Sequence, residues 1–379
     1  MSARGTDLTE ERPRRRRRPS PRAAEIIDFL EYLAPPSIGS PDQTYGLQIG
    51  SPGTEIRSMV VAPMATFNAL STAASRKQSL LITAAPLITE PLTSIRRDSP
   101  IGGKVAYLTE HRINLYALSN SYAAAPGGFD DSLAERLGLA ATSALVPTSY
   151  EPQFKIAIYV PPEAAERVRT AAAEAGAGRI GNYSHCSFNT RGTGTFLPRS
   201  GANPSVGSVG RLEQVEEVRI EMLVPQRELQ GVIAAILDAH PYEEVAYDVF
   251  VVKNPGVLYG RGRIGELPLK VSLDTVLAQV QDALGTDSIR CSHYPEFPIS
   301  SLAVASGVSD GLLWAANRGG AGAFITGDAS LQDRMLADGS TTVIIDIGFS
   351  ASVAPGLQRL VAQLRDTFQT DGIEILYVA

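Results

Sequence analysis

Residues 154–175 read FKIAIYVPPEAAERVRTAAAEA, and their composition changes within a few positions from one typical of a strand to one typical of a helix. The first part, Phe154–Val160, is rich in β-branched and aromatic residues and predicts a buried strand. The alanine-rich part, Glu163–Ala175, predicts a helix. Further along the chain we expect a polar loop at 176–210, strands at 218–224 and 247–252, and a helix at 227–239. This order is similar to β-α-β-β-α-β, which predicts a compact ferredoxin-like α+β domain at 151–253.

The segments on both sides of this domain alternate short apolar strands with amphipathic helices. Strands are expected at 59–62, 80–83 and 113–118 before the domain, and at 302–305, 323–325 and 343–345 after it. A helix at 272–284 carries an apolar stripe that includes Val276 and Val280. Such alternation is typical of layered α/β proteins. The sequence therefore predicts two α/β lobes, at 23–150 and 254–379, on either side of an inserted domain.

Composition excludes several classes of protein. Hydrophobic residues make up 44% of the 379 residues and charged residues 20%, which excludes a disordered chain. No apolar run approaches the roughly 18–20 residues of a membrane span, so no membrane association is expected. Two cysteines, Cys186 and Cys291, are too few for a disulfide scaffold, and four histidines leave little room for a multi-histidine metal site.

The first 22 residues form an arginine-rich tail that we expect to be disordered. They hold eight arginines, five of them consecutive at Arg14–Arg18, against three acidic residues. Such a charge run contacts polyanions weakly, and no apolar segment follows it as in a secretory signal. We therefore expect a cytoplasmic protein with an acidic body, not a dedicated nucleic-acid-binding domain.

Several longer strings resemble one protein family. They are AGAGRIGNYSHCSFNTRGTGTF at 175–196, HPYEEVAYDV at 240–249, APGGFDDSLAERLGL at 125–139, GRIGEL at 262–267 and IDIG at 345–348. In these strings the chain resembles the long form of the Ngg-interacting-factor-three-like family. Its members are also known as GTP cyclohydrolase 1 type 2 homologs or dinuclear metal centre hexameric proteins.

This resemblance implies a fold, an assembly and a chemistry. The fold is two similar α/β lobes forming one body, with a PII-like domain inserted between them in sequence. The assembly is a toroidal homohexamer whose inserted domains cap its openings. The chemistry is that of two adjacent metal ions held by histidine and acidic side chains.

The chain departs from the family pattern at each of the five implied ligand positions. They match Ala84, Ala85, Ala123, Phe349 and Val353. None of these side chains has a lone pair for a metal, whereas a metal site requires imidazole nitrogens or carboxylate oxygens. We therefore predict a degenerate site with no bound metal and no cofactor.

Polar residues near these positions are candidates for a small-molecule pocket. By the resemblance they are Thr83, Ser119, Ser121, Tyr122, Ser350, Asp328 and Asp346. Asp328 and Asp346 are weak candidates for a metal-free acid/base pair. The structural alternative is that Asp328 caps the following helix and Asp346 holds a strand end.

Three functions follow from these observations. The first is a non-catalytic hexameric binding or scaffold protein, in which the PII-like domain binds a partner or small ligand. The second is a hydrolase of the GTP cyclohydrolase type that acts on a nucleotide-like substrate such as GTP. The third is a ring tethered to nucleic acid by its arginine tail, which the acidic body disfavours. We expect the first.

Overall fold

The computed structural model describes residues 20–38, 45–202, 207–368 and 373–379. The chain forms two compact units, Met1–Val146 with Gly260–Ala379, and Pro147–Tyr259. Most of the arginine-rich tail, including Arg14–Arg18, lies outside the described residues. Arg22 does not belong to a tail, because it forms an isolated antiparallel bridge with Glu55. Within the described segments, no helix combines the length and apolar character that crossing a bilayer requires.

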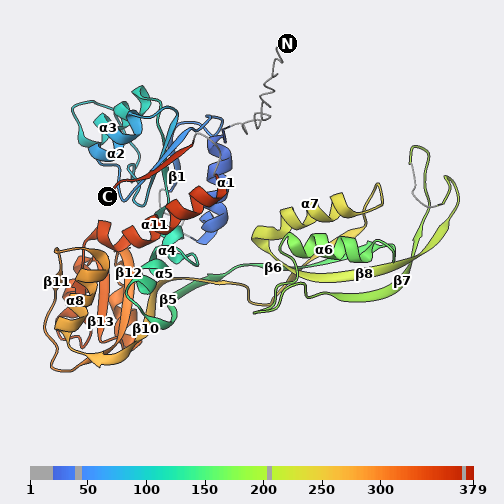
Figure 1. Ribbon diagram of the computed structural model, residues 1–379. Helices are drawn as coiled ribbons and strands as arrows, with labels where there is room; N and C mark the ends of the chain where they lie inside the picture. Colours follow the sequence, from blue (N-terminus) through green and yellow to red (C-terminus); the bar gives the residue numbers. More distant parts are fainter. Residues whose placement is uncertain (1–19, 39–44, 203–206, 369–372) are drawn as a thin grey trace, which may run out of the picture. The chain divides into compact units, whose positions relative to one another are not determined.

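The first unit contains a five-stranded sheet in the order β1-β4-β3-β2-β15. Its strands are β1 (Gly46–Ile49), β2 (Ser58–Ala62), β3 (Ser79–Thr83), β4 (Asn114–Ala117) and β15 (Glu374–Tyr377). All neighbours are parallel except β1, which runs antiparallel to β4. β2 and β3 are buried at every residue, as expected for parallel strands covered on both faces. The helices of this half are α1 (Ala23–Leu33), α2 (Phe67–Ala74) and α3 (Pro100–Glu110), with the short η1 (Pro36–Ile38) after α1 (Figure 1).

The first unit also contains a six-stranded sheet in the order β11-β14-β13-β12-β10-β5. Its strands are β5 (Ala140–Tyr150), β10 (Leu258–Val271), β11 (Arg290–Cys291), β12 (Ile299–Val308), β13 (Ala323–Asp328) and β14 (Val343–Asp346). The central strands β12, β13 and β14 are parallel, β10 runs antiparallel to β12, and β11 runs antiparallel to β14. The helices between these strands are α8 (Leu273–Leu284), α9 (Leu312–Arg318) and α10 (Leu331–Ala337). These two sheets confirm the predicted α/β class.

The two predicted lobes are not two separate halves of the sequence. β15 comes from the end of the chain but pairs with β2 in the first sheet. β5 precedes the second unit in sequence but is an edge strand of the second sheet. Sequence periodicity locates strands but does not reveal which sheet an edge strand joins, so the boundaries at 150 and 254 miss this exchange.

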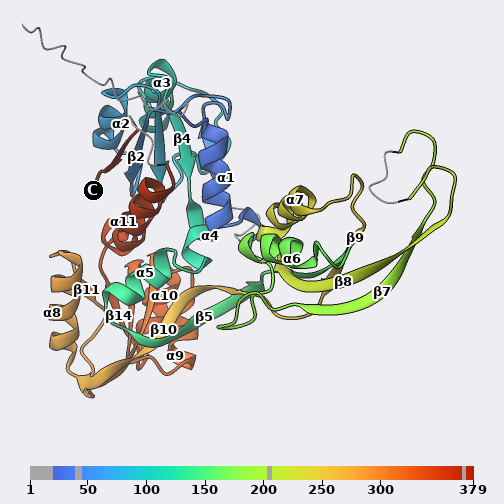
Figure 2. The ribbon, with the colours of Figure 1, turned by 45° about the vertical axis from the view of Figure 1, so that its right-hand side comes forward.

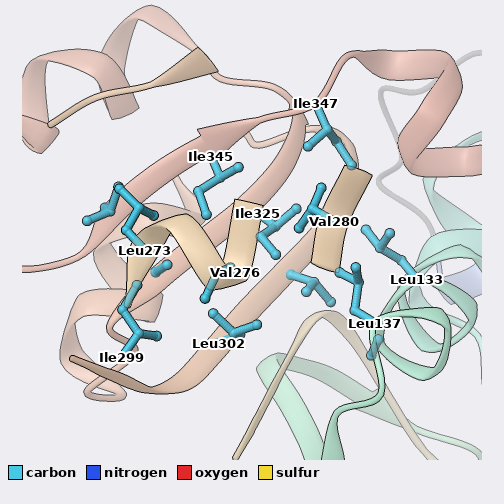
Figure 3. Close-up of a cluster of buried hydrophobic side chains, with 14 residues drawn as sticks. Leu133, Leu137, Leu273, Val276, Val280, Ile299, Leu302, Ile325, Ile345 and Ile347 are labelled. Atoms are coloured by element: carbon cyan, nitrogen blue, oxygen red, sulfur yellow. The ribbon is translucent and has the colours of Figure 1, made fainter. Parts of the chain in front are cut away.

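The apolar stripe of α8 forms the core of the second sheet, as its spacing predicts. Figure 3 shows Val276 and Val280 facing Ile325 and Ile345 of the strands, and both helix residues are fully buried. The helix begins where the Ser272 hydroxyl accepts a hydrogen bond from the Thr275 amide. It ends at Gly285, whose φ of 62° suits the left-handed end of a helix.

Helix α11 (Phe349–Thr367) connects the two sheets of the first unit. It contacts β12 and β13 of one sheet and β15 and β2 of the other, and it packs against α5 (Phe129–Arg136) (Figure 2). The approach to α5 is close, since a Cβ at Gly356 would lie 2.5 Å from the Phe129 ring. A short helix, α4 (Ser119–Ala124), precedes α5. The N-cap of α5 is Gly128.

The second unit is a single four-stranded antiparallel sheet with two helices. The chain order is β6 (Gln153–Val160), α6 (Ala165–Glu174), β7 (Phe188–Phe196), β8 (Glu213–Pro225), η2 (Gln226–Glu228), α7 (Leu229–Ala239) and β9 (Tyr247–Val252). The strands lie in the order β7-β8-β6-β9. This is the predicted β-α-β-β-α-β order. Its core lies between the helices and one face of the sheet. The strands contribute Ile156, Ile158 and Ile220 to this core, and the helices contribute Val168 and Val232.

The expectation of a loop over residues 176–210 is wrong in part. This segment contains β7, which pairs with β8 over nine residues from Phe188 to Phe196. The sequence pattern does not indicate this strand. It is an exposed edge strand with glycines at 192 and 194, and its apolar residues do not alternate with polar ones.

The second unit contains one buried histidine, His240, whose ring is fully hydrogen-bonded. Its Nε2 lies 3.1 Å from the Tyr159 carbonyl oxygen, and its Nδ1 accepts from the Tyr242 amide at 3.1 Å. Burial lowers the pKa of His240 and outweighs the raising effect of the hydrogen bond to the Tyr159 carbonyl, and Arg167 adds a smaller lowering. Protonating Nδ1 would place an N–H against the Tyr242 N–H, so the folded unit favours the neutral ring.

We predict that the stability of the second unit falls as the pH drops below about 6.5, where the unfolded chain takes up a proton first. The full contribution is present above that pH. In His240→Asn, the side-chain oxygen accepts the same amide proton but does not titrate, so this loss should disappear. Hydrogen exchange of β6 amides at pH 7.5 and pH 5 measures it, with the exposed His111→Asn as the control. Equal pH dependence in wild type and His240→Asn would contradict the assignment.

Candidate functional site

The candidate site is a cavity of about 340 Å³ in the first unit, where β3 and β12 end and helices α4, α5 and α11 begin. All five residues at the implied ligand positions line it: Ala84, Ala85, Ala123, Phe349 and Val353. These residues come from three parts of the chain that are far apart in sequence. The fold thus brings together the positions that the resemblance selected separately.

Each of these side chains is held by a defined local structure. Ala84 and Ala85 directly follow β3, and the Thr83 hydroxyl holds their turn by donating to the Ala85 carbonyl oxygen at 2.7 Å. Ala123 lies on α4. Phe349 and Val353 are four residues apart at the start of α11, so they lie on one face of that helix.

These five positions form apolar walls. Ala84, Ala123 and Val353 are 4%, 2% and 1% exposed, and the Phe349 ring is half-buried. Methyl groups and a phenyl ring provide no lone pair for a metal ion. The donor set at these positions therefore does not fit the di-metal centre that the resemblance implies.

Four polar residues also line the cavity, and the sequence analysis did not select any of them. They are Thr89, Asn120, Ser306 and Asp310. Ser306 lies near the carboxyl end of β12, and Asp310 follows that strand with a φ of 47°. The sequence signal for these two residues was their position at the carboxyl end of a predicted strand. Open α/β sheets bind ligands at this end of their strands.

Comparison with known proteins identifies the family of the chain. The profile of the family Duf34/NIF3 (NGG1p interacting factor 3) matches residues 21–379. The chain belongs to this family. A Bacillus subtilis relative named "GTP cyclohydrolase 1 type 2 homolog" is 36% identical over 304 residues, which cover 80% of this chain and 82% of the relative. A relative of the same name from Mycobacterium tuberculosis is 35% identical over 356 residues, 92% of this chain and 93% of the relative.

Solved structures show the Duf34/NIF3 fold. The crystal structure of a Bacillus cereus protein related to NIF3 matches with a TM-score of 0.84 and 34% identity, over 94% of this chain and 96% of that one. The Staphylococcus aureus protein SA1388 matches with a TM-score of 0.66 at 23% identity, which shows the fold alone. The mixed α/β architecture with several sheets is thus that of the family.

A buried charged network lies directly behind the cavity of this Duf34/NIF3 chain. Asp130 on α5 is fully buried, and one of its oxygens accepts from the Ser306 amide at 2.7 Å and the Ser306 hydroxyl at 2.6 Å. The other oxygen accepts from the Gly262 amide at 2.6 Å and lies 3.5 Å from Arg261 Nε. Residues 129–136 and residues 260–265 are therefore partners in the fold.

Apart from Ser119, of which only the backbone is described, the polar residues that the sequence predicted for the pocket are not in the lining of this cavity. Thr83 and Ser121 are buried, and Thr83 bonds within its own turn. Tyr122 is buried with its hydroxyl 3.4 Å from Gln363 Oε1, and burial raises its pKa. Ser350 is exposed on α11, and Ser119 is the first residue of α4. Short sequence distance from the ligand positions was therefore not enough to place a side chain in the cavity.

Asp328 and Asp346 lie together in a separate cavity of about 260 Å³. Asp346 accepts from the Ala329 and Gly348 amides and pairs with Arg334 at 2.7 Å, so it holds the end of β14. Asp328 does not cap the following helix, which corrects the expectation. The hydroxyl of Ser330 caps α10 instead.

The described part of the chain contains no group of three or more His, Cys, Asp or Glu side chains that could hold a metal ion. His185 is exposed in the loop beside Cys186, whereas His240 is buried in the core of the same unit. Both cysteines are unpaired.

Proposed function

We propose that this Duf34/NIF3 chain is a non-catalytic, hexameric binding or scaffold protein with a degenerate di-metal site. One observation carries the proposal: five positions that match the ligands of the family line a single cavity, and all five are apolar. A metal ion needs donors at about 2.0–2.2 Å, and side chains of this kind supply none. We therefore derive no metal-assisted step for this chain.

The cavity supports binding of a small, mostly apolar molecule. Its walls are methyl groups and the rings of Phe129 and Phe349, and Asn120 and Asp310 add polar groups to its lining. A volume of about 340 Å³ falls within the usual range of small-molecule sites. The Ser306 hydroxyl is engaged by Asp130, so it holds the wall of the cavity and does not face a ligand as a free donor.

The remaining parts of the proposal concern the assembly. The β-α-β-β-α-β topology of the second unit supports its description as a PII-like inserted domain. Two unpaired cysteines suit the reducing cytoplasm. The chain would form a toroidal homohexamer, with weak polyanion contact through Arg14–Arg18 and no membrane partner. A native mass of six chains supports this assembly, and a stable monomer contradicts it.

The alternative is a metal-dependent hydrolase acting on a nucleotide-like substrate such as GTP. The printed name of the relatives, GTP cyclohydrolase 1 type 2 homolog, favours it. In this chain the acid/base work would fall to Asp328 and Asp346, which lie in one cavity with Arg290 and Arg334.

A GTP turnover assay separates the two functions. We expect no product above the buffer rate with the full chain in the presence of Zn²⁺, Mn²⁺ or Fe²⁺. The control is Asp274→Asn on the exposed side of α8, which should behave like wild type. Turnover that is lost in Asp328→Asn or Asp346→Asn, but kept in Asp274→Asn, would instead establish the hydrolase.

A further inference from the structure

One charged residue is among the described residues that line the candidate cavity of the first unit. It is Asp310, in the loop that follows β12. Its carboxylate makes no hydrogen bond or ion pair with any residue that the structure describes. The Arg261 guanidinium is engaged elsewhere, since it donates to the Ser306 and Val308 carbonyl oxygens and lies 3.5 Å from Asp130. The Asp310 carboxylate is therefore available to a ligand in the cavity.

The loop that carries Asp310 is held by a second, buried carboxylate. Asp333 on α10 is fully buried and accepts hydrogen bonds from the Ser309 hydroxyl, from the Gly311 amide at 3.2 Å and from the Leu313 amide at 3.3 Å. Both sequence neighbours of Asp310 are thus bound to one side chain. Asp310 itself has a φ of 47°, in the left-handed region that residues other than glycine, asparagine and aspartate rarely adopt. Such a fixed, unfavourable backbone conformation is typical of loops that position a functional group.

The rest of the cavity provides an apolar surface and one amide. The Phe349 ring packs against the Asp310 loop, since a Cβ at Gly307 would lie 3.4 Å from that ring. Phe129 adds a second ring to the lining. Asn120 on α4 is half-buried, lines the same cavity, and also has no hydrogen-bond partner among the described residues. A ligand that matches these groups has an aromatic or other apolar body and a polar end that donates hydrogen bonds.

We propose that this cavity binds an aromatic molecule that carries an amidinium or protonated amino group. Its cationic end would lie at Asp310, and its ring against Phe129 and Phe349. A carboxylate accepts two parallel N–H bonds from an amidinium group, and it repels an anion of the same shape. This inference rests on the proposed binding function and names the ligand class of the same site.

Isothermal titration of the full chain tests the proposal with benzamidine and with benzamide, an uncharged molecule of similar shape. We expect benzamidine to bind, and benzamide to bind about fivefold more weakly, which is the scale of a partly exposed ion pair. Asp310→Asn should weaken benzamidine binding by about the same factor and leave benzamide binding within about twofold. Asparagine adopts the left-handed conformation as readily as aspartate, so this variant removes the charge and keeps the loop.

The matched control is Asp274→Asn, the same change at an exposed position of α8 outside the lining of the cavity. It should bind benzamidine like wild type. The inference is overturned if benzamidine does not bind, if benzamide binds equally well, or if the two aspartate variants behave alike. The proposed binding function fails by a different result, namely metal-dependent GTP turnover by the wild-type chain.

Discussion

Replacing Asp130 by alanine is expected to destabilise the first unit by about 3–5 kcal/mol. The carboxylate is fully buried and accepts three hydrogen bonds of 2.6–2.7 Å from Ser306 and Gly262. Its removal leaves two backbone N–H groups and the Ser306 hydroxyl without their acceptor, and it removes the carboxylate 3.5 Å from Arg261 Nε; each such loss costs free energy.

Urea unfolding followed by tryptophan fluorescence measures this effect in the first unit. The single tryptophan, Trp314, lies on α9 of that unit, with the Arg318 guanidinium over its ring. The control is Asp282→Ala at an exposed position of α8, which should change the free energy of unfolding by less than about 0.5 kcal/mol. A similarly small change in Asp130→Ala would show that the network does not support the fold.

Restoring the family's donors at all five cavity positions is expected to create metal binding. The variant combines Ala84→His, Ala85→His, Ala123→Asp, Phe349→His and Val353→Glu, which are the residue types that the family resemblance implies at these positions. Because positions 123 and 353 are nearly fully buried, the new carboxylates should destabilise the metal-free variant. A divalent ion would neutralise them, so Zn²⁺ should raise the stability by about 2.7 kcal/mol at a hundredfold excess over Kd.

Thermal unfolding with and without Zn²⁺ measures this gain. A matched variant that keeps the three histidines but carries Ala123→Asn and Val353→Gln lacks the negative charge. It should bind Zn²⁺ at least about tenfold more weakly, a difference of roughly 1.4 kcal/mol. If the five-site variant folds but gains no stability from Zn²⁺, Mn²⁺ or Fe²⁺, these positions do not mark a ligand shell.

Much of the fold follows from local sequence pattern. The stripe of Val276 and Val280 predicts α8 and its buried face, and the β-branched and aromatic residues of Phe154–Val160 predict β6. What the pattern misses depends on distant partners. β7 forms because β8 supplies its hydrogen bonds, and β15 joins the first sheet although it ends the chain.

Part of the candidate site also follows from the sequence, and the rest depends on residues that are distant along the chain. The sequence selected the five apolar positions, and the structure places them in one cavity. It did not select Ser306 and Asp310, because their place in the cavity depends on where β12 ends relative to α4 and α11. It also did not pair Asp130 with Arg261, since nothing local reveals a contact between residues 131 positions apart.

The central claim is that this chain does not hold the two metal ions that the family resemblance implies. Elemental mass spectrometry of tag-free protein, purified without chelator, measures metal content per chain directly. We predict near-zero zinc, iron, manganese and nickel in a protein that keeps its fold. About two metal ions per chain, the content of a dinuclear site, would contradict the account and give the hydrolase first place.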